Sequence, residues 1–361
     1  MKKALIAFAS AILISTLLIS MVFAFHYNNF DTKGVVYLEN KYDIKYLCVH
    51  GRRYCAISNS GNCYIGGGEL RENSNYGVEN IRTYNNFQNV NSDKSSYVRI
   101  YDKGDAVYAK ITPYGGTIIT ENNDVYVFLN GNEKYRTPTY LCTGYESAIV
   151  GNDSKVYLLS QNGVLEYIDV NKPDNRHFIG DNIKKFDYER KSNIYSIFAL
   201  TNDNKLYIIN PDEQIENNEK YLSDITDFDI LVPHEALCVF TYVNTKGTAY
   251  FLMDDLEIDY NDLNDSSFFW RRGKNIKSVT AYDGGIAMLD DKDDLYLYGD
   301  DFHYPDGMRE FNEDLVFSDV AAVFGGTDTL AILKTDGKFY HYGKQADLAY
   351  IFYITPPERK R

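Results

Sequence analysis

The stretch Leu330–Gly343, LAILKTDGKFYHYG, decides the fold, because it has the pattern of one β-hairpin. Its Asp336-Gly337 pair is a strong two-residue turn signal, since both central residues of a type I′ turn need positive φ. A turn centred there places opposed residues on a shared face of the hairpin. One face then holds Ala331, Leu333, Tyr340 and Tyr342, and the other holds Ile332, Phe339 and His341. Both faces are largely apolar, which predicts a sheet that is covered on both sides.

Weaker copies of this hairpin recur along the chain. Aligned on Tyr340, the copies carry Tyr64, Tyr126, Tyr157, Tyr207, Tyr250 and Tyr296. Their turn pairs fall at the same offset: Ser60-Gly61, Asn122-Asn123, Asp153-Ser154, Asp203-Asn204, Lys246-Gly247 and Lys292-Asp293. The second member is always Gly, Asn, Asp or Ser, and most of these residues tolerate the left-handed region. Turn and strand positions agree together, which favours a true repeat over unrelated hairpins.

The spacing of the repeat indicates a propeller. Successive repeat tyrosines are 62, 31, 50, 43, 46 and 44 residues apart, and a period in the forties is typical of propeller blades. Blades pack face to face around an axis, which explains hairpins that are apolar on both sides. The sequence therefore predicts an all-β fold, a β-propeller of about seven blades in one domain over residues 25–361. We expect a strand at Gly34–Tyr42 or at Ala349–Ile354 to complete a blade from the opposite end of the chain.

Two of the units resemble RCC1-type (regulator of chromosome condensation) propeller repeats. That repeat runs from valine through small residues and alanine-leucine to aspartate-glycine, an aromatic residue and glycine. Val320–Gly343 matches it closely and Lys277–Gly299 less well, and Tyr64–Leu70 is similar to its glycine-rich loop. The resemblance covers about residues 44–345 and implies the propeller of an exported, bacterial-type member. Gly326-Thr327-Asp328 replaces the family's usual histidine, tyrosine replaces the frequent tryptophan, and several units lack the later glycines, which leaves the blade count open.

Residues 1–24 have the pattern of a targeting segment. Lys2 and Lys3 precede an apolar run, and Val22-Phe23-Ala24 fits the cleavage site of a signal peptide. The run is also long enough to span a bilayer as an uncleaved N-terminal hydrophobic helix. Both alternatives leave the rest of the chain on the extracellular side, because positive charge keeps the N-terminus in the cytoplasm. The sequence therefore predicts a protein that is secreted or that meets the membrane only through this segment.

The charge and the motifs exclude several classes of function. A net charge of −14 argues against nucleic acid and anionic membrane surfaces as partners, since phosphate binding needs clustered Lys and Arg. The acidic runs Asp254–Asp265 and Asp290–Asp294 do not match a calcium-binding loop. The chain has no H-E-x-x-H, G-x-S-x-G, Walker A or dinucleotide-binding motif. The sequence thus predicts no metal and no cofactor, and it leaves enzymatic activity open while favouring a non-enzyme.

The five cysteines are Cys48, Cys55, Cys63, Cys142 and Cys238, and their spacing is not that of a zinc site. The hairpin register above places Cys63 opposite Ser58, so a Cys55–Cys63 bond would need a different register. Cys48 could pair with either residue. Export would permit a disulfide, and buried free thiols in strands are the alternative, so the sequence selects no pairing.

Three long polar segments carry the candidate binding residues: Glu69–Ser96, Asp254–Lys274 and Asp300–Asp314. Each follows the tyrosine-bearing strand of its unit, so we expect all three on the face of the disc opposite the Asp-Gly-type turns. The candidates are Tyr76, Tyr84, Tyr260, Trp270, Arg271, Arg272 and Tyr304. Aromatic residues beside arginines are common anchors of protein interfaces. The main hypothesis is therefore an exported propeller scaffold that binds a protein partner at the cell surface. The alternatives are a glycan- or cell-wall-binding protein, an enzyme with an axial active site built from loops, and plain loops.

Overall fold

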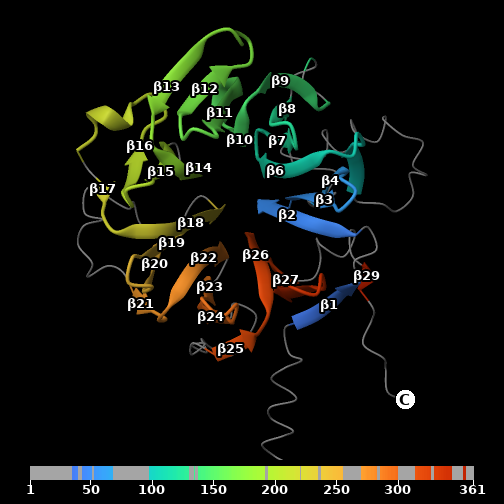
Figure 1. Ribbon diagram of the computed structural model, residues 1–361, viewed down its shortest axis with the longest axis vertical. Helices are drawn as coiled ribbons and strands as arrows, with labels where there is room; N and C mark the ends of the chain where they lie inside the picture. Colours follow the sequence, from blue (N-terminus) through green and yellow to red (C-terminus); the bar gives the residue numbers. More distant parts are fainter. Residues whose placement is uncertain are drawn as a thin grey trace, which may run out of the picture.

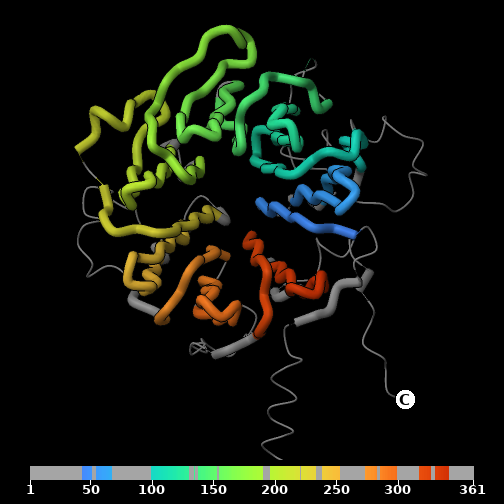
Figure 2. The backbone as a smooth tube through the Cα atoms, in the orientation of Figure 1, coloured from blue at the N-terminus to red at the C-terminus, as the bar shows by residue number. Residues whose placement is uncertain are grey.

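The computed structural model shows seven antiparallel sheets arranged radially around a central axis (Figure 1). The tube in Figure 2 shows the chain passing from blade to blade around this ring. The structure describes residues 35–39, 43–50, 53–67, 97–129, 134, 137–191, 194–219, 221–234, 237–254, 270–282, 285–299, 314–326, 329–343 and 353–354. The predicted seven-bladed, all-β propeller is confirmed. Over these residues no helix is both long and apolar enough to cross a bilayer. The hydrophobic helix predicted for residues 1–24 lies outside them.

The blades are numbered by their order around the ring. Within each blade the strands are given from the innermost outward. Blade 1 holds β2 (Ile44–His50), β3 (Arg53–Ser58), β4 (Cys63–Gly67) and β5 (Tyr97–Tyr101). Blade 2 holds β6 (Ala106–Thr112), β7 (Gly115–Thr120), β8 (Asp124–Leu129) and β9 (Thr139–Thr143). Blade 3 holds β10 (Tyr145–Val150), η2 (Asn152–Ser154), β11 (Lys155–Ser160), β12 (Leu165–Asp169) and β13 (Arg176–Gly180). Blade 4 holds β14 (Ile183–Lys191), β15 (Ile194–Thr201), β16 (Leu206–Ile209), η3 (Ile215–Asn217) and β17 (Tyr221–Leu222).

The remaining blades follow the same plan. Blade 5 holds β18 (Ile225–His234), β19 (Leu237–Asn244), β20 (Ala249–Asp254) and β21 (Trp270–Arg272). Blade 6 holds β22 (Ile276–Tyr282), β23 (Gly285–Asp290), β24 (Leu295–Gly299) and β25 (Asp314–Phe317). Blade 7 holds β26 (Val320–Gly326), β27 (Thr329–Lys334), β28 (Phe339–Gly343), β1 (Val35–Glu39) and β29 (Tyr353–Ile354).

Both chain ends close the ring. β1 pairs antiparallel with β28, with Val36 opposite His341, and β29 then pairs with β1. Blade 7 is therefore assembled from residues near both ends of the chain, as the two predicted terminal strands indicated. Such closure leaves only short outer edges exposed on each blade.

The core consists of seven clusters of buried side chains, each shared by two neighbouring blades. Blades 4 and 5, for example, meet through Phe198, Phe228 and Phe240. The centroid of the Phe198 ring lies 6.2 Å from that of Phe228 and 5.8 Å from that of Phe240. Each hairpin therefore buries one face against the blade before it and the other against the blade after it. This is the physical reason for the apolar residues on both faces of Leu330–Gly343.

The predicted register of the hairpins was wrong by one residue. Ile332, rather than Leu333, lies opposite Tyr340. The turn is a three-residue loop closed by Lys334 and Lys338, and the Gly337 N–H donates to the Lys334 carbonyl at 2.9 Å. Gly337 is the loop residue with positive φ, at 81°, which fits a type I turn followed by a bulge rather than a type I′ turn. As a result, Ala331, Leu333 and Phe339 face blade 1, and Leu330, Ile332 and Tyr340 face blade 6.

The copy placed at Asp153-Ser154 was also wrong, whereas the other six turn pairs lie at hairpin turns. Ser154 ends η2, between β10 and β11 at the other end of the blade. The true turn of blade 3 lies between β11 and β12, with Gly163 at φ 78°, and Tyr167 is the repeat tyrosine. Ser154 resembles a hairpin turn residue because it too has positive φ, 64°, and because Tyr157 follows three residues later. With Tyr167 the spacings of 31 and 50 become 41 and 40 residues, so the period is more regular.

The hairpin turns also join neighbouring blades. In six blades the carbonyl of the positive-φ turn residue accepts a hydrogen bond from the first strand of the next blade; Gly61 accepts from the Ala106 N–H at 3.1 Å, and Asn204 from the Ile225 N–H at 2.9 Å. A second bond connects the turn to the residue just before the first strand of its own blade, as from the Asn202 N–H to the Asn182 carbonyl at 2.8 Å. The turn residues are therefore determined by contacts between blades as well as by the turn itself.

Candidate functional site

The seven inner strands surround the axis and share one irregularity. Each has a bulge near its start, so corresponding residues can be aligned around the ring. Two aligned levels result. The first holds Tyr46, Tyr108, Ser147, Lys185, Asp227, Ser278 and Ala322, and the second holds Cys48, Lys110, Ile149, Asp187, Asp229, Thr280 and Phe324. The charged members come only from blades 2, 4 and 5, so these two levels are charged on one side of the axis and uncharged on the other.

The axial charges pair with one another across blades. Lys110 in blade 2 lies 3.0 Å from Asp187 in blade 4, and Lys185 in blade 4 lies 2.7 Å from Asp227 in blade 5. Asp229 accepts a hydrogen bond from the Ala281 N–H of blade 6 at 2.8 Å. The Lys110–Asp187 pair joins blades 2 and 4, which are not neighbours in the ring. The other two interactions add to the packed contacts of blades 4 and 5 and of blades 5 and 6.

Burial changes the ionisation of this network. Burial raises the pKa of Asp229 to about 6, and the negative charge of Asp187 adds to the rise, while Lys185 and Lys110 oppose it. Burial alone would lower the pKa of Lys110, but Asp187 together with Cys48, Tyr108 and Asp229 outweighs it, so the pKa of Lys110 is raised well above its usual value. The ammonium of Lys110 therefore stays charged, and the carboxyl of Asp229 titrates near neutral pH.

Replacing Asp229 with asparagine is expected to change the pH dependence of stability. Because the pKa of Asp229 in the folded protein, about 6, exceeds its unfolded value of 3.8, its contribution is favourable below about pH 4. That contribution is lost as the pH rises through 6, and the total loss is about 3 kcal/mol. Urea unfolding should show Asp229→Asn gaining on the natural protein between pH 4 and pH 7, the range in which the natural protein loses this stability. The exposed Asp291→Asn is the control, and a pH-independent difference would contradict the assignment.

The axis is where a loop-built active site was considered as an alternative. Asp187, Asp227 and Asp229 are engaged with lysines and backbone N–H groups, and Glu189 lies 3.7 Å from His50 of blade 1. Across the ranges that the structure describes, no three His, Cys, Asp or Glu side chains are grouped to hold a metal ion. A candidate binding site that is more open than the axis lies at the outer rim.

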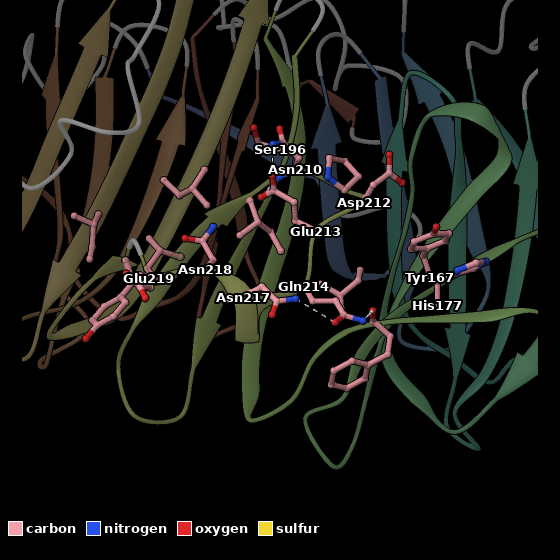
Figure 3. A pocket seen from close by; sticks show the side chains of 18 of the residues that line it. Tyr167, His177, Ser196, Asn210, Asp212, Glu213, Gln214, Asn217, Asn218 and Glu219 are labelled. Carbon is pink, nitrogen blue, oxygen red and sulfur yellow. Dashed lines mark hydrogen bonds between the residues drawn. The ribbon is translucent and has the colours of Figure 1, made fainter.

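A groove of about 1100 Å³ lies between blades 3 and 4. One wall comes from β12 and β13, including Tyr167 and Arg176–Ile179, and the other comes from β15, β16, β17 and the connection between the last two. Figure 3 shows Tyr167 and His177 side by side at one end of this groove, with Asn217, Asn218 and Glu219 toward the other. We call it the rim groove.

The connection that builds the rim groove is ordered by local interactions. Asn210-Pro211-Asp212-Glu213 forms a turn in which the Glu213 N–H donates to the Asn210 carbonyl at 3.0 Å, and proline is favoured at its second position. η3 follows, and its buried Ile215 packs into the core between blades 3 and 4. Gly180 makes this fit possible, since a Cβ there would lie 2.8 Å from the Ile215 side chain.

Polar side chains line most of the rim groove. Asn210 donates to Glu213 at 2.8 Å, and Gln214 donates to the Phe178 carbonyl at 3.5 Å. The Tyr167 and His177 rings stack with centroids 4.5 Å apart. Phe178 and Tyr221 are each 38% exposed, so the groove offers aromatic surfaces beside many hydrogen-bonding groups.

The sequence-predicted site residues lie elsewhere on the rim. Trp270, Arg271 and Arg272 form β21, the outer strand of blade 5, with Arg271 opposite Tyr250. Tyr76, Tyr84, Tyr260 and Tyr304 lie outside the described residues.

The rim groove was not predicted from the sequence, since Asn210–Glu219 is shorter than the three long polar segments and was not singled out. A signal for it was available. This segment joins the third and fourth strands of its blade, as the three long polar segments do in blades 1, 5 and 6. It therefore lies on the face opposite the hairpin turns, where partner binding was expected.

Comparisons with known proteins establish the fold only. No family model and no curated protein matches the chain. The Cps50 (Swd1) β-propeller domain of Myceliophteria thermophila is similar in structure, with 11% identity, coverage of 84% of this chain and 96% of that one, and a TM-score of 0.51. A chain of the mitotic checkpoint complex has 12% identity, coverage of 86% and 91%, and a TM-score of 0.49. Prp20p of Saccharomyces cerevisiae has 15% identity, coverage of 84% and 83%, and a TM-score of 0.48. At such identities the similarity shows a β-propeller and carries no functional argument.

Proposed function

We propose that this protein is a binding scaffold that holds an extended, basic segment of a protein partner in the rim groove. The observation that carries this proposal is the groove itself, an open space of about 1100 Å³ with polar walls between two blades. Pockets for small molecules are about 300–1,000 Å³ and mostly apolar. A groove of this size whose lining is more polar than apolar suits a peptide, because an extended backbone presents N–H and carbonyl groups along its whole length.

The charge of the rim groove favours a basic segment. Asp212, Glu213 and Glu219 line one wall, against Arg176 on the other. Arg176 is already paired with Glu166 at 2.8 Å, and Asp212 with Lys155 at 2.7 Å. Glu213 and Glu219 therefore supply the net charge that a partner meets, in a chain whose overall charge is −14. Complementary charge raises association rates and selects partners.

A wider surface on the same rim extends this proposal. β21 carries Trp270, Arg271 and Arg272 on the next blade around the ring, and we propose these residues as a second contact region for a partner that spans blades 4 and 5. The hairpin-turn face would then take no part in binding.

A glycan is the second candidate ligand. It is favoured by the stacked Tyr167 and His177 rings next to amide side chains, since aromatic surfaces with nearby hydrogen-bonding groups suit sugar rings. A glycan should bind without strong dependence on salt, whereas a basic peptide should bind less tightly as salt increases.

Charge reversal in the rim groove is expected to weaken peptide binding about tenfold, or about 1.4 kcal/mol. The variant is Glu213→Lys with Glu219→Lys, and the probe is a fluorescent panel of extended peptides ranging from acidic to basic. Glu121→Lys with Asp291→Lys is the matched control, because it makes the same charge change on the hairpin-turn face. Basic peptides should bind the natural protein and the control alike. Equal loss in both variants would contradict the rim groove as the site.

We also propose that the protein is an exported RCC1-type propeller, secreted or anchored through residues 1–24. The apolar run after Lys2 and Lys3 and the turn signature of Val320–Gly343 support this assignment. Protease added to intact cells should degrade the propeller while cytoplasmic controls survive. A protected protein would refute export, and N-terminal sequencing that starts at Phe25 would identify a cleaved signal peptide.

A further inference from the structure

Three of the five cysteines lie on one face of blade 1. Cys48 in β2 is opposite Cys55 in β3, and Cys63 in β4 is opposite Ile57, two residues from Cys55. Residues two apart on a strand share a face, so Cys63 is the diagonal neighbour of Cys55. All three are buried in the core between blades 1 and 2.

Cys55 and Cys63 are in direct contact. Their Sγ atoms lie 3.2 Å apart, and both side chains are fully buried. A disulfide has an S–S distance of about 2.05 Å, so a movement of roughly 1.2 Å would bring the two sulfurs to bonding distance. The one-residue correction of the hairpin register is what creates this contact, because the predicted register placed Cys63 opposite Ser58.

Cys48 is placed differently from the other two. Its thiol receives a hydrogen bond from the backbone of Ile111 in blade 2, and burial raises its pKa to about 11. Contact with Cys63, together with burial, also raises the pKa of Cys55 well above its usual value. The thiols of Cys48 and Cys55 are therefore protonated and slow to react once the two blades have packed together.

We propose that Cys55 and Cys63 form an intra-blade disulfide when the protein folds in an oxidising compartment. Two S–H bonds break and one S–S bond forms. The two electrons and two protons reduce the disulfide of a small-molecule oxidant such as oxidised glutathione to two thiols, through a mixed disulfide. The step precedes packing of blade 1 on blade 2, because neither sulfur is exposed afterwards. The bond would tie β3 to β4 at the position where the ring begins, and this inference does not depend on the partner-binding function.

Peptide mapping tests the pairing directly. The full chain is refolded in a glutathione redox buffer, denatured with N-ethylmaleimide and digested with trypsin. Cys55 and Cys63 fall in one peptide, Tyr54–Arg71, and Cys48 falls in another, Tyr46–Arg52. The expected result is a Tyr54–Arg71 peptide without maleimide and lighter by two hydrogen atoms, with Cys48 alkylated. Maleimide on both Cys55 and Cys63, or a bond from Cys48 to either, would overturn the proposal.

Thermal unfolding gives a second readout. The oxidised protein should melt about 3–6 °C above the protein reduced in denaturant and refolded with reductant. Cys63→Val should abolish this difference, because Cys63 belongs to the proposed bond, and Cys48→Val should keep it. The two variants are matched, since each removes one buried thiol of the same cluster. A redox shift that disappears only in Cys48→Val would assign the bond to Cys48 and refute the Cys55–Cys63 pair.

Discussion

Replacing Lys110 with methionine is expected to lower the free energy of unfolding by about 3–5 kcal/mol. Methionine keeps most of the side-chain volume but leaves the Asp187 carboxylate buried without the ammonium that lies 3.0 Å from it. Asp187 has 7% of its side chain exposed, so water cannot replace the lost partner. The loss should be measured by urea unfolding at pH 7.

Two further variants separate this cause from simple loss of packing. The double variant Lys110→Met with Asp187→Leu removes both charges and should recover most of the lost stability, because replacing a whole buried pair is often neutral. Lys277→Met breaks an ion pair whose side chains are 38% and 46% exposed, and should cost less than about 1 kcal/mol. A double variant no more stable than Lys110→Met would show that the charge pairing is not the cause.

Replacing Gly61 with alanine is expected to cost about 3–5 kcal/mol, from left-handed strain and overpacking together. Gly61 has φ 70°, and an added Cβ would lie 2.3 Å from the backbone carbon of Gly104. That backbone leads into blade 2, so the two blades would have to separate, and the hydrogen bond from the Ala106 N–H to Gly61 would lengthen.

Gly337→Ala is the matched control for this prediction. Gly337 is the equivalent turn residue of blade 7 with φ 81°, and an added Cβ there would meet none of the residues that the structure describes within 4 Å. Only the left-handed strain of about 1–2 kcal/mol remains in this variant. The difference between the two alanine variants in thermal or urea unfolding therefore isolates the contact between blades 1 and 2. Equal losses would mean that the turns do not determine how the blades pack.

Much of the candidate site was beyond local sequence reasoning. The rim groove depends on Ile215 packing beside Gly180 across two blades, and such proximity follows from how the blades stack. The axial network has the same origin, because Lys110 and Asp187 are 77 residues apart and meet only when blades 2 and 4 approach the axis. In contrast, the face of the disc that holds the groove could be deduced from strand direction alone, because successive strands of a blade run in opposite directions.

The sequence by itself determined that the chain is a propeller of about seven two-sided blades, since turn residues and apolar positions recur with a period in the forties and act locally. Only the tertiary structure decided the register within each hairpin. A Gly or Asn at the turn is compatible with both a two-residue and a three-residue loop, and the pairing of the folded strands shows the three-residue loop. That one-residue choice brings Cys55 against Cys63 and assigns every strand residue to one neighbouring blade or the other, because side chains alternate between faces at each step along a strand.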